Sequence, residues 1–383
     1  MGEITWVTCL FDIRSKENMT KKVPYVKLSD EYLIYGEFTM ALDVPLIIYI
    51  DKKYEAYCIE KRKDKMNKTQ IITMDFEDLP YYSYFDDIKK IHSNINNPSQ
   101  KDTILYVILT WSKFSLLKRS MKNNPFNSDY FGWVDFGLIH VYAHHILKQY
   151  IAKTESIQLF KSMAVEYNKV FNIKYDKLHI LNVLPCVVNG DAEYTHHNTD
   201  DSIINSMACG FFTGHKNIIS IIIDLFERYS EKYMVKKCYI LEEKILTHIY
   251  IDIPELFDVY HGYYSGILAN SIQFTYDLSF LTSHLIHFRK QNNWNKNIEI
   301  CEPIFESFKN NHFENENQIY CSKFLDEYYL ACFYTDKNKA LEVAKFYAKR
   351  VTTNEKFKNA FEDNETHIRK NFSYLHVCVF QDI

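Results

Sequence analysis

The residues of most chemical interest lie in the segment Tyr130–Gly137, where a single carboxylate, Asp135, follows an apolar run. Two of only nine glycines in the 383 residues, Gly132 and Gly137, bracket this carboxylate. A carboxylate placed directly after a buried strand faces a ligand site rather than the core. Such a group can hold a cation or accept a hydrogen bond from a sugar hydroxyl. The segment therefore predicts a ligand site at the end of a strand.

Glycine is scarce enough in this chain for its positions to be informative. Seven glycines fall at positions 132, 137, 190, 210, 214, 262 and 266, each in or beside a loop that follows an apolar run. Glycine permits close approach of the backbone to a ligand, although its ordinary place is a turn. Because these positions cluster with Asp135, Glu243 and His261, we expect several of the loops to border one site.

Several familiar motifs are excluded. The letters Asp135-Phe-Gly137 match the magnesium-binding triplet of protein kinases, but the sequence lacks the Gly-rich loop, the strand lysine and the His-Arg-Asp loop that accompany it. The sequence also lacks the phosphate-loop, dinucleotide-binding, nucleophile-elbow and His-Glu-x-x-His motifs.

The elements that must position these residues alternate between strands and helices. Short β-branched runs predict strands at 3–12, 44–50, 70–76, 130–135, 177–185 and 207–213. Helical spacing predicts helices at 102–122, 138–170, 217–234 and 239–250. This alternation is typical of an α/β domain with a mostly parallel sheet flanked by helices.

The composition changes near residue 272. From there to residue 383 there is no glycine, the one proline is Pro303, and apolar residues recur at helical spacing in 300–308, 319–330 and 340–348. We therefore expect an α/β domain over 1–272 and an all-helical C-terminal domain over 273–383. The helical domain is expected to support self-association into a homo-oligomer or to position an acceptor.

Bulk properties limit the partners and the compartment. A formal net charge of −4 favours neither nucleic acid nor an anionic membrane as a partner. No apolar run reaches about 18 residues, so no membrane span is expected. Nine cysteines without a Cys-x-x-Cys pair, and no secretory signal, predict a cytoplasmic location with reduced thiols. Richness in Asn, Lys, Ile, Tyr and Phe indicates an AT-rich genome, and the location is the host cytoplasm if the source is a virus.

Eight segments together resemble a known family. They are Val7–Ile13, Leu46–Asp51, Trp111–Phe114 with Asn124–Phe126, Phe131–Gly137, Cys209–His215, Leu241–Leu246, Pro254–Phe257, and Tyr260–Tyr264 with Asn270. In order and spacing, over about residues 4–272, the chain resembles the HtrL/YibB-like proteins, a group of bacterial and viral sequences related to glycosyltransferases. The strongest match is the Trp-x-Asp-x-Gly of Trp133, Asp135 and Gly137.

The resemblance implies a GT-A-like fold, which is a Rossmann-type mixed sheet flanked by helices. It also implies a glycosyltransferase that takes a UDP- or GDP-sugar donor and a glycan or protein-linked hydroxyl acceptor. Two departures bear on the metal. Asp135 is one carboxylate where many GT-A enzymes have Asp-x-Asp, and Tyr263 stands where an Asp is expected.

Residue roles follow from the resemblance and from the chemistry of a diphosphate leaving group, whose charge a divalent cation or Lys/Arg must meet. Donor-binding residues are expected at Asp12, Lys113, Trp133, Asp135, Gly137 and Gly214. A cation, Mn²⁺ or Mg²⁺, is expected on Asp135 with His261 or His215, and Lys113 supplies the charge if no metal binds. Glu243 is the candidate general base, with Asp191 and Glu193 as alternates.

Two other functions fit the same residues. A single carboxylate and Tyr263 are also compatible with a binding or scaffold protein that retains the fold without turnover. A nucleotidyltransferase is the third alternative. Solvated helix faces, helix-start acids and strand-end caps remain the ordinary explanations for Lys113, Glu243 and Asp12 respectively.

Overall fold

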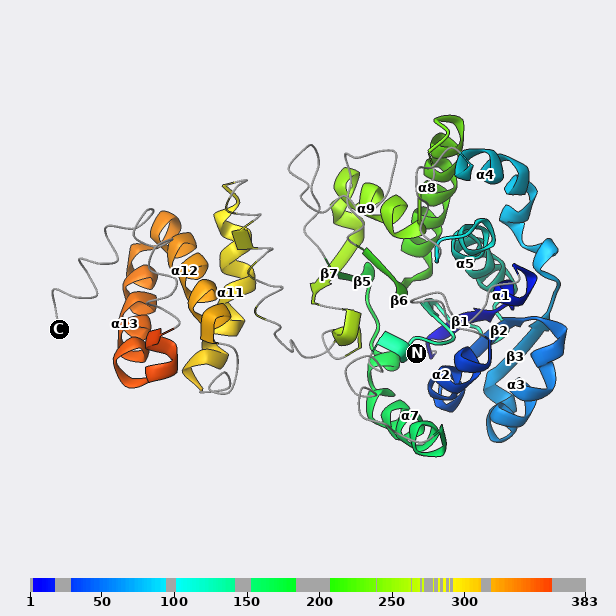
Figure 1. Ribbon diagram of the computed structural model, residues 1–383, viewed down its shortest axis with the longest axis horizontal. Coiled ribbons are helices and arrows are strands. Elements are labelled where there is room, and N and C mark those ends of the chain that lie inside the picture. The colour runs from blue at the N-terminus through cyan, green and yellow to red at the C-terminus, as the bar shows by residue number, and fades with distance from the viewer. Residues whose placement is uncertain are drawn as a thin grey trace. The chain divides into compact units, whose positions relative to one another are not determined.

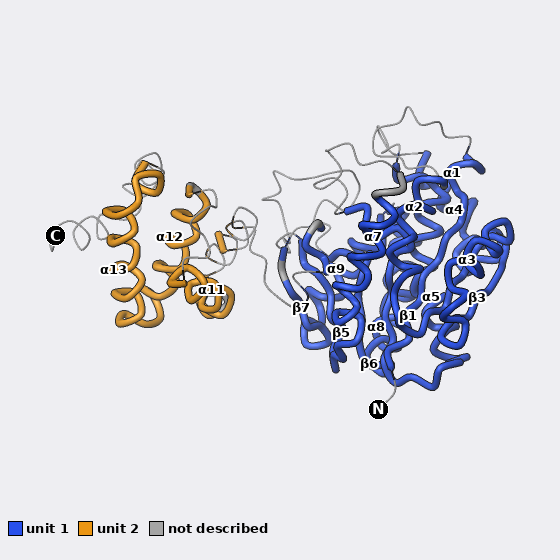
Figure 2. The backbone as a smooth tube through the Cα atoms, turned by 90° about the horizontal axis from the view of Figure 1, so that it is seen from below, with its two compact units in different colours: residues 1–275 blue, residues 276–383 orange. Residues whose placement is uncertain are grey.

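The computed structural model describes residues 3–17, 29–93, 101–141, 153–183, 207–268 except 239 and 263, 271, five positions between 278 and 289, 292–310 and 318–359. Asp191 and Glu193 lie outside these residues. The chain divides into two compact units, residues 1–275 and 276–383 (Figure 2).

A seven-stranded mixed sheet forms the centre of the first unit (Figure 1). Its spatial order is β3-β2-β1-β4-β6-β5-β7. The strands are β1 (Thr5–Leu10), β2 (Leu46–Ile50), β3 (Thr69–Thr73), β4 (Tyr130–Val134), β5 (Leu178–Asn182), β6 (Met207–His215) and β7 (Phe257–His261). β6 is antiparallel to both β4 and β5, and every other pair is parallel. The carboxyl ends of all strands except β6 therefore share one edge of the sheet.

The expected fold class, a Rossmann-type mixed sheet flanked by helices with a helical C-terminal region, is confirmed. Six of the strands lie where the β-branched runs predict them. The seventh, β7, was not predicted, because Phe257–His261 follows Pro254 closely and has only a short alternating pattern. The predicted helix 138–170 is described only in part, as α7 (Lys153–Tyr167).

Helices cover both faces of the sheet (Figure 1). On one face lie α5 (Ile104–Asn123), α8 (Lys216–Val235) and α9 (Glu242–Asp252), and Phe114 of α5 stacks on Phe226 of α8 with ring centroids 3.9 Å apart. On the other face, α2 (Ser29–Ala41) packs beside α7. There Trp6 of β1 stacks on Phe211 of β6 at 5.0 Å and donates through Nε1 to the carbonyl of Phe171 at 2.9 Å.

Residues at the two ends of α5 determine where this helix begins and ends. The Thr103 side chain caps α5 by accepting from the backbone N–H of Tyr106, and Asn124 ends the helix in the left-handed region at φ 35°. Between these two ends, Lys113 is among the buried residues of the helix.

A buried arginine fixes the chain between α2 and β3. Arg62, the last residue of α3 (Glu55–Arg62), is fully buried and donates to the carbonyl oxygens of Met40, Leu42 and Val44 and to Oγ1 of Thr69. Burial lowers its pKa to about 10. No carboxylate is needed, because carbonyl oxygens satisfy the guanidinium.

The second unit contains α11 (Trp294–Lys309), α12 (Gln318–Thr335) and α13 (Lys337–Thr353). Buried aromatic and aliphatic side chains of all three helices form one core, and Asp336 caps α13 by accepting from the N–H groups of Asn338 and Lys339. In the part of the chain that the structure describes, no helix is both long enough and apolar enough to cross a membrane.

Candidate active site

A pocket opens at the carboxyl ends of β1 and β4, beside Asp135. One wall is a stripe of α5, namely Tyr106, Leu109, Thr110 and Lys113, spaced as neighbours on a helix face. The rest of the lining includes Arg14 of α1 (Ile13–Lys16), Lys101, and the segment that follows β4 through Gly137 and His140. The Nδ1 nitrogen of His140 lies 2.8 Å from the carbonyl of Gly137, which fixes the end of this segment.

A buried lysine forms the centre of the site. Lys113 Nζ lies 2.9 Å from Oδ1 of Asp135 and 3.1 Å from Oε1 of Glu242, and it donates to the carbonyl of Cys209 at 3.3 Å. Burial of Lys113 opposes its charge, but Asp135 and Glu242 outweigh that effect and raise its pKa well above 10.5. Lys113 is therefore a permanently charged ammonium rather than a solvated side chain on a helix face.

Asp135 is oriented by its own strand and by β6. Trp133, two residues earlier on β4, donates from Nε1 to Oδ1 of Asp135 at 2.7 Å, and the backbone N–H of Asp135 donates to the carbonyl of Gly210 at 2.8 Å. Trp133 is only 1% exposed, whereas the Asp135 side chain is 34% exposed. Trp133 thus supports the carboxylate from beneath and does not itself reach a ligand.

The charge of the pocket lining is positive. Its charged residues are Arg14, Lys101, Lys113 and Asp135, so the lining alone sums to +2; Glu17 and Glu242, which pair with Arg14 and Lys113, lie outside this lining and are not counted in it. Arg14 and Lys101 each lie 5.4 Å from the ring centroid of Tyr106, and Arg14 is also paired with Glu17 at 3.3 Å. A lining of this sign favours an anionic ligand such as a phosphate or diphosphate.

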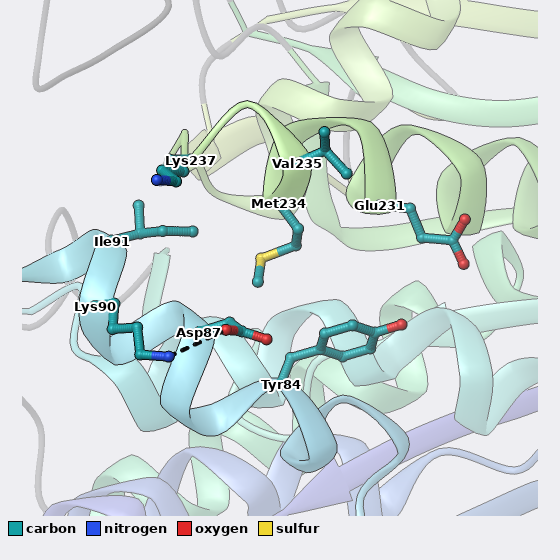
Figure 3. A pocket seen from close by; sticks show the side chains of 8 residues that line it. All are labelled: Tyr84, Asp87, Lys90, Ile91, Glu231, Met234, Val235 and Lys237. Atoms are coloured by element: carbon teal, nitrogen blue, oxygen red, sulfur yellow. Dashed lines mark ion pairs between the residues drawn. The ribbon is translucent and has the colours of Figure 1, made fainter.

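A second hollow of the surface differs in charge. It is an open groove between α4 (Phe85–His92) and the C-terminal end of α8, where Met234 points across toward α4 (Figure 3). Its charged lining consists of Asp87, Glu231, Lys90 and Lys237, which balance to zero. The pocket at Asp135 is therefore the better candidate for an anion.

Asp12 and Asp51, the acids that follow β1 and β2, accept hydrogen bonds from nearby backbone N–H groups. Oδ2 of Asp51 accepts from the N–H of Asp12 at 2.6 Å, and Asp12 caps α1 through Ser15 and forms an ion pair with Lys53. Burial raises the pKa of Asp51, and its bond from Asp12 works in the opposite direction. Asp12 does not line the pocket, so the strand-end cap is the interpretation that the structure favours.

Glu243 is half-buried in the first turn of α9, where Tyr264 donates a hydrogen bond to its Oε1. Burial and the neighbouring carboxylate of Glu242 raise the pKa of Glu243 to about 7, while the Tyr264 bond and the charges of Lys101 and Lys113 oppose the rise. A carboxylate with a pKa near neutrality has the property that a general base needs.

The structure does not bring the proposed histidine ligands to Asp135. β6 runs antiparallel, so His215 pairs with Tyr130 at the start of β4, five residues before Asp135, and at about 3.3 Å per residue it lies roughly 17 Å from Asp135. Its Nδ1 accepts from Asn217 and caps α8. His261 ends β7, three strand spacings from β4, or about 14 Å.

Two of the glycines have packing roles. A Cβ on Gly214 would lie 2.8 Å from the carbonyl oxygen of Lys177, at the edge opposite Asp135, so Gly214 serves the close approach of β6 to the chain before β5. Gly132 lies inside β4, where a Cβ would meet the Trp6 ring at 2.5 Å. Gly137 is the expected donor-binding glycine that does line the pocket.

The described residues around Asp135 do not fit a divalent cation. Among them, no cluster of three His, Cys, Asp or Glu side chains could hold a metal ion. Oδ1 of Asp135 already accepts from Lys113 and from Trp133, and the second carboxylate, Glu242, is bound to the same ammonium. A metal held by both Asp135 and Glu242 would have to displace Lys113 from its two carboxylate partners.

Sequence reasoning did not find four of the residues that build the site: Glu242, Arg14, Lys101 and His140. Glu242 is adjacent to Glu243, the predicted general base. Consecutive residues of a helix point in different directions, and Glu242 is the one that forms an ion pair with Lys113. Arg14 could have been found, because it follows Asp12 at the carboxyl end of β1.

Fold and site together define an α/β protein with a cationic pocket at the carboxyl edge of a mixed sheet. The chain belongs to the HtrL_YibB family, described as a bacterial protein of unknown function, which it matches over residues 2–268. The family resemblance of the sequence is thereby confirmed. Among curated proteins, none matches the chain.

Solved structures similar to this chain include three transferases by title. Mouse xyloside xylosyltransferase 1 in its apo form has a TM-score of 0.34 and 10% identity, covering 67% of this chain and 84% of that one. The 4-diphosphocytidyl-2C-methyl-D-erythritol synthase from Anaerococcus prevotii has a TM-score of 0.30 and 11% identity, covering 74% and 95%. The inositol-1-phosphate CTP transferase from T. maritima has a TM-score of 0.29 and 12% identity, covering 68% and 86%. Because these TM-scores lie below 0.5, the likenesses do not identify a reaction.

Proposed function

We propose that the protein is a glycosyltransferase that moves a sugar from a UDP- or GDP-sugar to a hydroxyl of a glycan or a protein-linked acceptor. The observation that carries this proposal is the pocket of net positive charge at the carboxyl ends of β1 and β4, with Asp135 at its rim. In open α/β sheets this edge is where nucleotides bind. The resemblance of Trp133, Asp135 and Gly137 to the family signature supports the same function.

In the proposed reaction the base is Glu243, which is not among the lining residues of the pocket but is close enough to Lys101 and Lys113 for their charges to lower its pKa. The acceptor oxygen attacks the anomeric carbon of the sugar, and the bond from that carbon to the diphosphate oxygen breaks with its electron pair on the diphosphate. The proton of the acceptor hydroxyl passes to Glu243, whose pKa of about 7 leaves a large fraction ionised at neutral pH. Arg14 and Lys101 face the diphosphate charge from the pocket wall. Asp191 stays a proposed alternative base.

Release of the nucleoside diphosphate tests this function. The purified chain is incubated with a panel of UDP- and GDP-sugars, and free UDP or GDP is measured for wild type and for Glu243→Gln. We expect slow donor hydrolysis by wild type, reduced at least about tenfold in Glu243→Gln because the base is lost. Binding without release would favour the scaffold alternative. Pyrophosphate release from a nucleoside triphosphate and a sugar phosphate would favour a nucleotidyltransferase.

We also propose that the helical C-terminal domain makes protein contacts, either between copies of the chain or with the acceptor. Its charged surface helices and its own core support an independent role. A chain that lacks residues 290–383 is expected to change in oligomeric state or acceptor use, as measured by light scattering and by product analysis. No change in either would contradict the proposal.

A further inference from the structure

A single ammonium links the two carboxylates at the centre of the site. Lys113 Nζ is surrounded by three oxygens, Asp135 Oδ1 at 2.9 Å, Glu242 Oε1 at 3.1 Å and the Cys209 carbonyl at 3.3 Å. An ammonium has three N–H donors, and each has an acceptor here. The side chains of Lys113 and Glu242 are only 7% and 5% exposed, so water does not compete for these bonds.

The three oxygens surround Lys113 Nζ as the ligands of a metal site surround a metal ion. Oxygen ligands from a strand end, a helix start and a backbone carbonyl are what a divalent cation would need. Here these oxygens converge on Nζ of Lys113 instead, and Oδ1 of Asp135 also accepts a hydrogen bond from Nε1 of Trp133. The ring of Trp133 lies 5.8 Å from Nζ, which adds a favourable contact to the charged form of the lysine.

We propose that Lys113, held by Asp135 and Glu242, takes the place of a divalent cation, so that the donor diphosphate binds to cations of the protein without a metal. This inference rests on the proposed function. Arg14 and Lys101 contact the diphosphate, whereas Lys113 occupies the place of the metal and offsets the negative charge of Asp135 and Glu242. Asp135 is then a positioning residue for Lys113 rather than a metal ligand. The single carboxylate of the sequence motif is sufficient for that role, since its partner is an ammonium and not a metal.

The variant Asp135→Asn distinguishes a carboxylate that positions Lys113 from a carboxylate that binds a metal ion. The asparagine keeps a carbonyl oxygen for Lys113 and Trp133, and Glu242 keeps the ammonium charged, so metal-free binding should survive with a loss of less than about tenfold. If Asp135 were a metal ligand, the same substitution should weaken Mn²⁺-dependent binding strongly, because asparagine lacks the negative charge of the carboxylate.

Lys101→Ala tests the contact with the anion. Lys101 is exposed, so its removal is not expected to affect folding, and it should weaken binding by roughly tenfold through loss of one charge-assisted bond. The matched control is Lys90→Ala, which removes an exposed lysine that pairs with Asp87 in the groove of zero net charge between α4 and α8 (Figure 3). The control should leave binding unchanged.

The variant Lys113→Ala should turn the site into one that binds a divalent cation. Loss of the ammonium leaves Asp135 and Glu242 facing each other without a counter-charge, so the variant is expected to gain saturable Mn²⁺ binding that the wild type lacks. Electron paramagnetic resonance of free Mn²⁺ measures this directly, without a nucleotide. If this variant does not fold, Asp135→Asn and Lys101→Ala still decide the question.

The experiment is calorimetric titration of the full chain with UDP, GDP and inorganic pyrophosphate, once in EDTA and once in excess Mn²⁺. We expect affinities within about threefold in the two buffers, retention in Asp135→Asn, and weakening in Lys101→Ala but not in Lys90→Ala. Binding that is at least about tenfold tighter with Mn²⁺ and is lost in Asp135→Asn would overturn the inference and leave the proposed function intact. Absence of binding by every probe in both buffers would overturn the proposed function, and the inference with it.

Discussion

The phenol of Tyr264 donates a hydrogen bond to Oε1 of Glu243, joining the turn Tyr264–Gly266 to the first turn of α9. This bond favours the carboxylate form of Glu243, whereas burial and Glu242 favour the protonated form. The balance sets the pKa at about 7. Tyr264 therefore controls the pH range in which Glu243 can accept a proton.

Tyr264→Phe should shift the pH dependence of transfer. In wild type, kcat/KM falls as the pH drops below about 7, because a base must be deprotonated. Removing the phenol raises the pKa of Glu243 further, so the acidic limb of the pH profile should move to higher pH by roughly 0.5–1 unit. Rates measured from pH 5 to 9 check this, and a limb that stays in place or moves to lower pH would contradict it.

Trp133→Phe should weaken donor binding because it removes the Nε1 bond that orients Asp135. It should also cost about 2–4 kcal/mol in the free energy of unfolding, since a large buried ring is reduced. The control is Trp111→Phe, an equally buried indole on α5 that donates to the carbonyl of Ile240 at 3.2 Å. Urea unfolding should give similar losses for both variants. If UDP titration then showed equal effects, the role assigned to Trp133 would be wrong.

Arg62→Met should lower the free energy of unfolding by about 3–5 kcal/mol. The substitution leaves the carbonyl oxygens of Met40, Leu42 and Val44 buried without a donor. Arg119→Met, at an exposed position of α5, is the matched control and should change stability by no more than about 0.5 kcal/mol. Chemical denaturation of the two variants measures the difference. Equal losses of stability would rule out a stabilising role for the hydrogen bonds from Arg62 to these carbonyl oxygens.

Asp326→Asn should stabilise the helical unit at high pH. Burial raises the pKa of Asp326 well above its usual value, with the Tyr347 side chain opposing the rise. Because the folded pKa is the higher one, this group's contribution is fully present below the unfolded pKa of about 3.9 and is lost as pH rises toward the folded pKa, by at most about 1.4 kcal/mol per unit. An asparagine does not titrate and escapes this loss.

Calorimetry of the full chain at pH 5 and pH 8 checks this. The difference in Tm between Asp326→Asn and wild type should grow with pH. Glu327, whose pKa burial raises to about 6 against the effect of Arg289, titrates in both proteins, and its charge is one of the causes that raise the pKa of Asp326 in wild type. Asp336→Asn, which keeps the cap of α13, is the control for replacing an aspartate of the same unit, and the difference for Asp326→Asn should grow with pH more than that of the control. A pH-independent difference for Asp326→Asn would contradict the prediction.

The sequence predicted where most strands lie, because buried β-branched runs are local features. It did not predict the direction of β6, since strand polarity depends on distant pairing. That direction separates His215 and Gly214 from Asp135. The sequence singled out Lys113 and Asp135 individually, yet the ion pair between them and the choice of Glu242 over Glu243 depend on how α9 packs, which no spacing encodes. Their roles in a reaction stay predictions.

The contact between Gly132 and Trp6 has a consequence for how relatives of this chain can vary. A Cβ at position 132 would lie only 2.5 Å from the indole of Trp6, and that indole donates a hydrogen bond through Nε1 to the carbonyl of Phe171. Neither position can therefore change alone without cost. Relatives that carry a larger residue at position 132 should carry a smaller side chain at position 6, so the two positions beneath the Asp135 strand are expected to vary together as one unit.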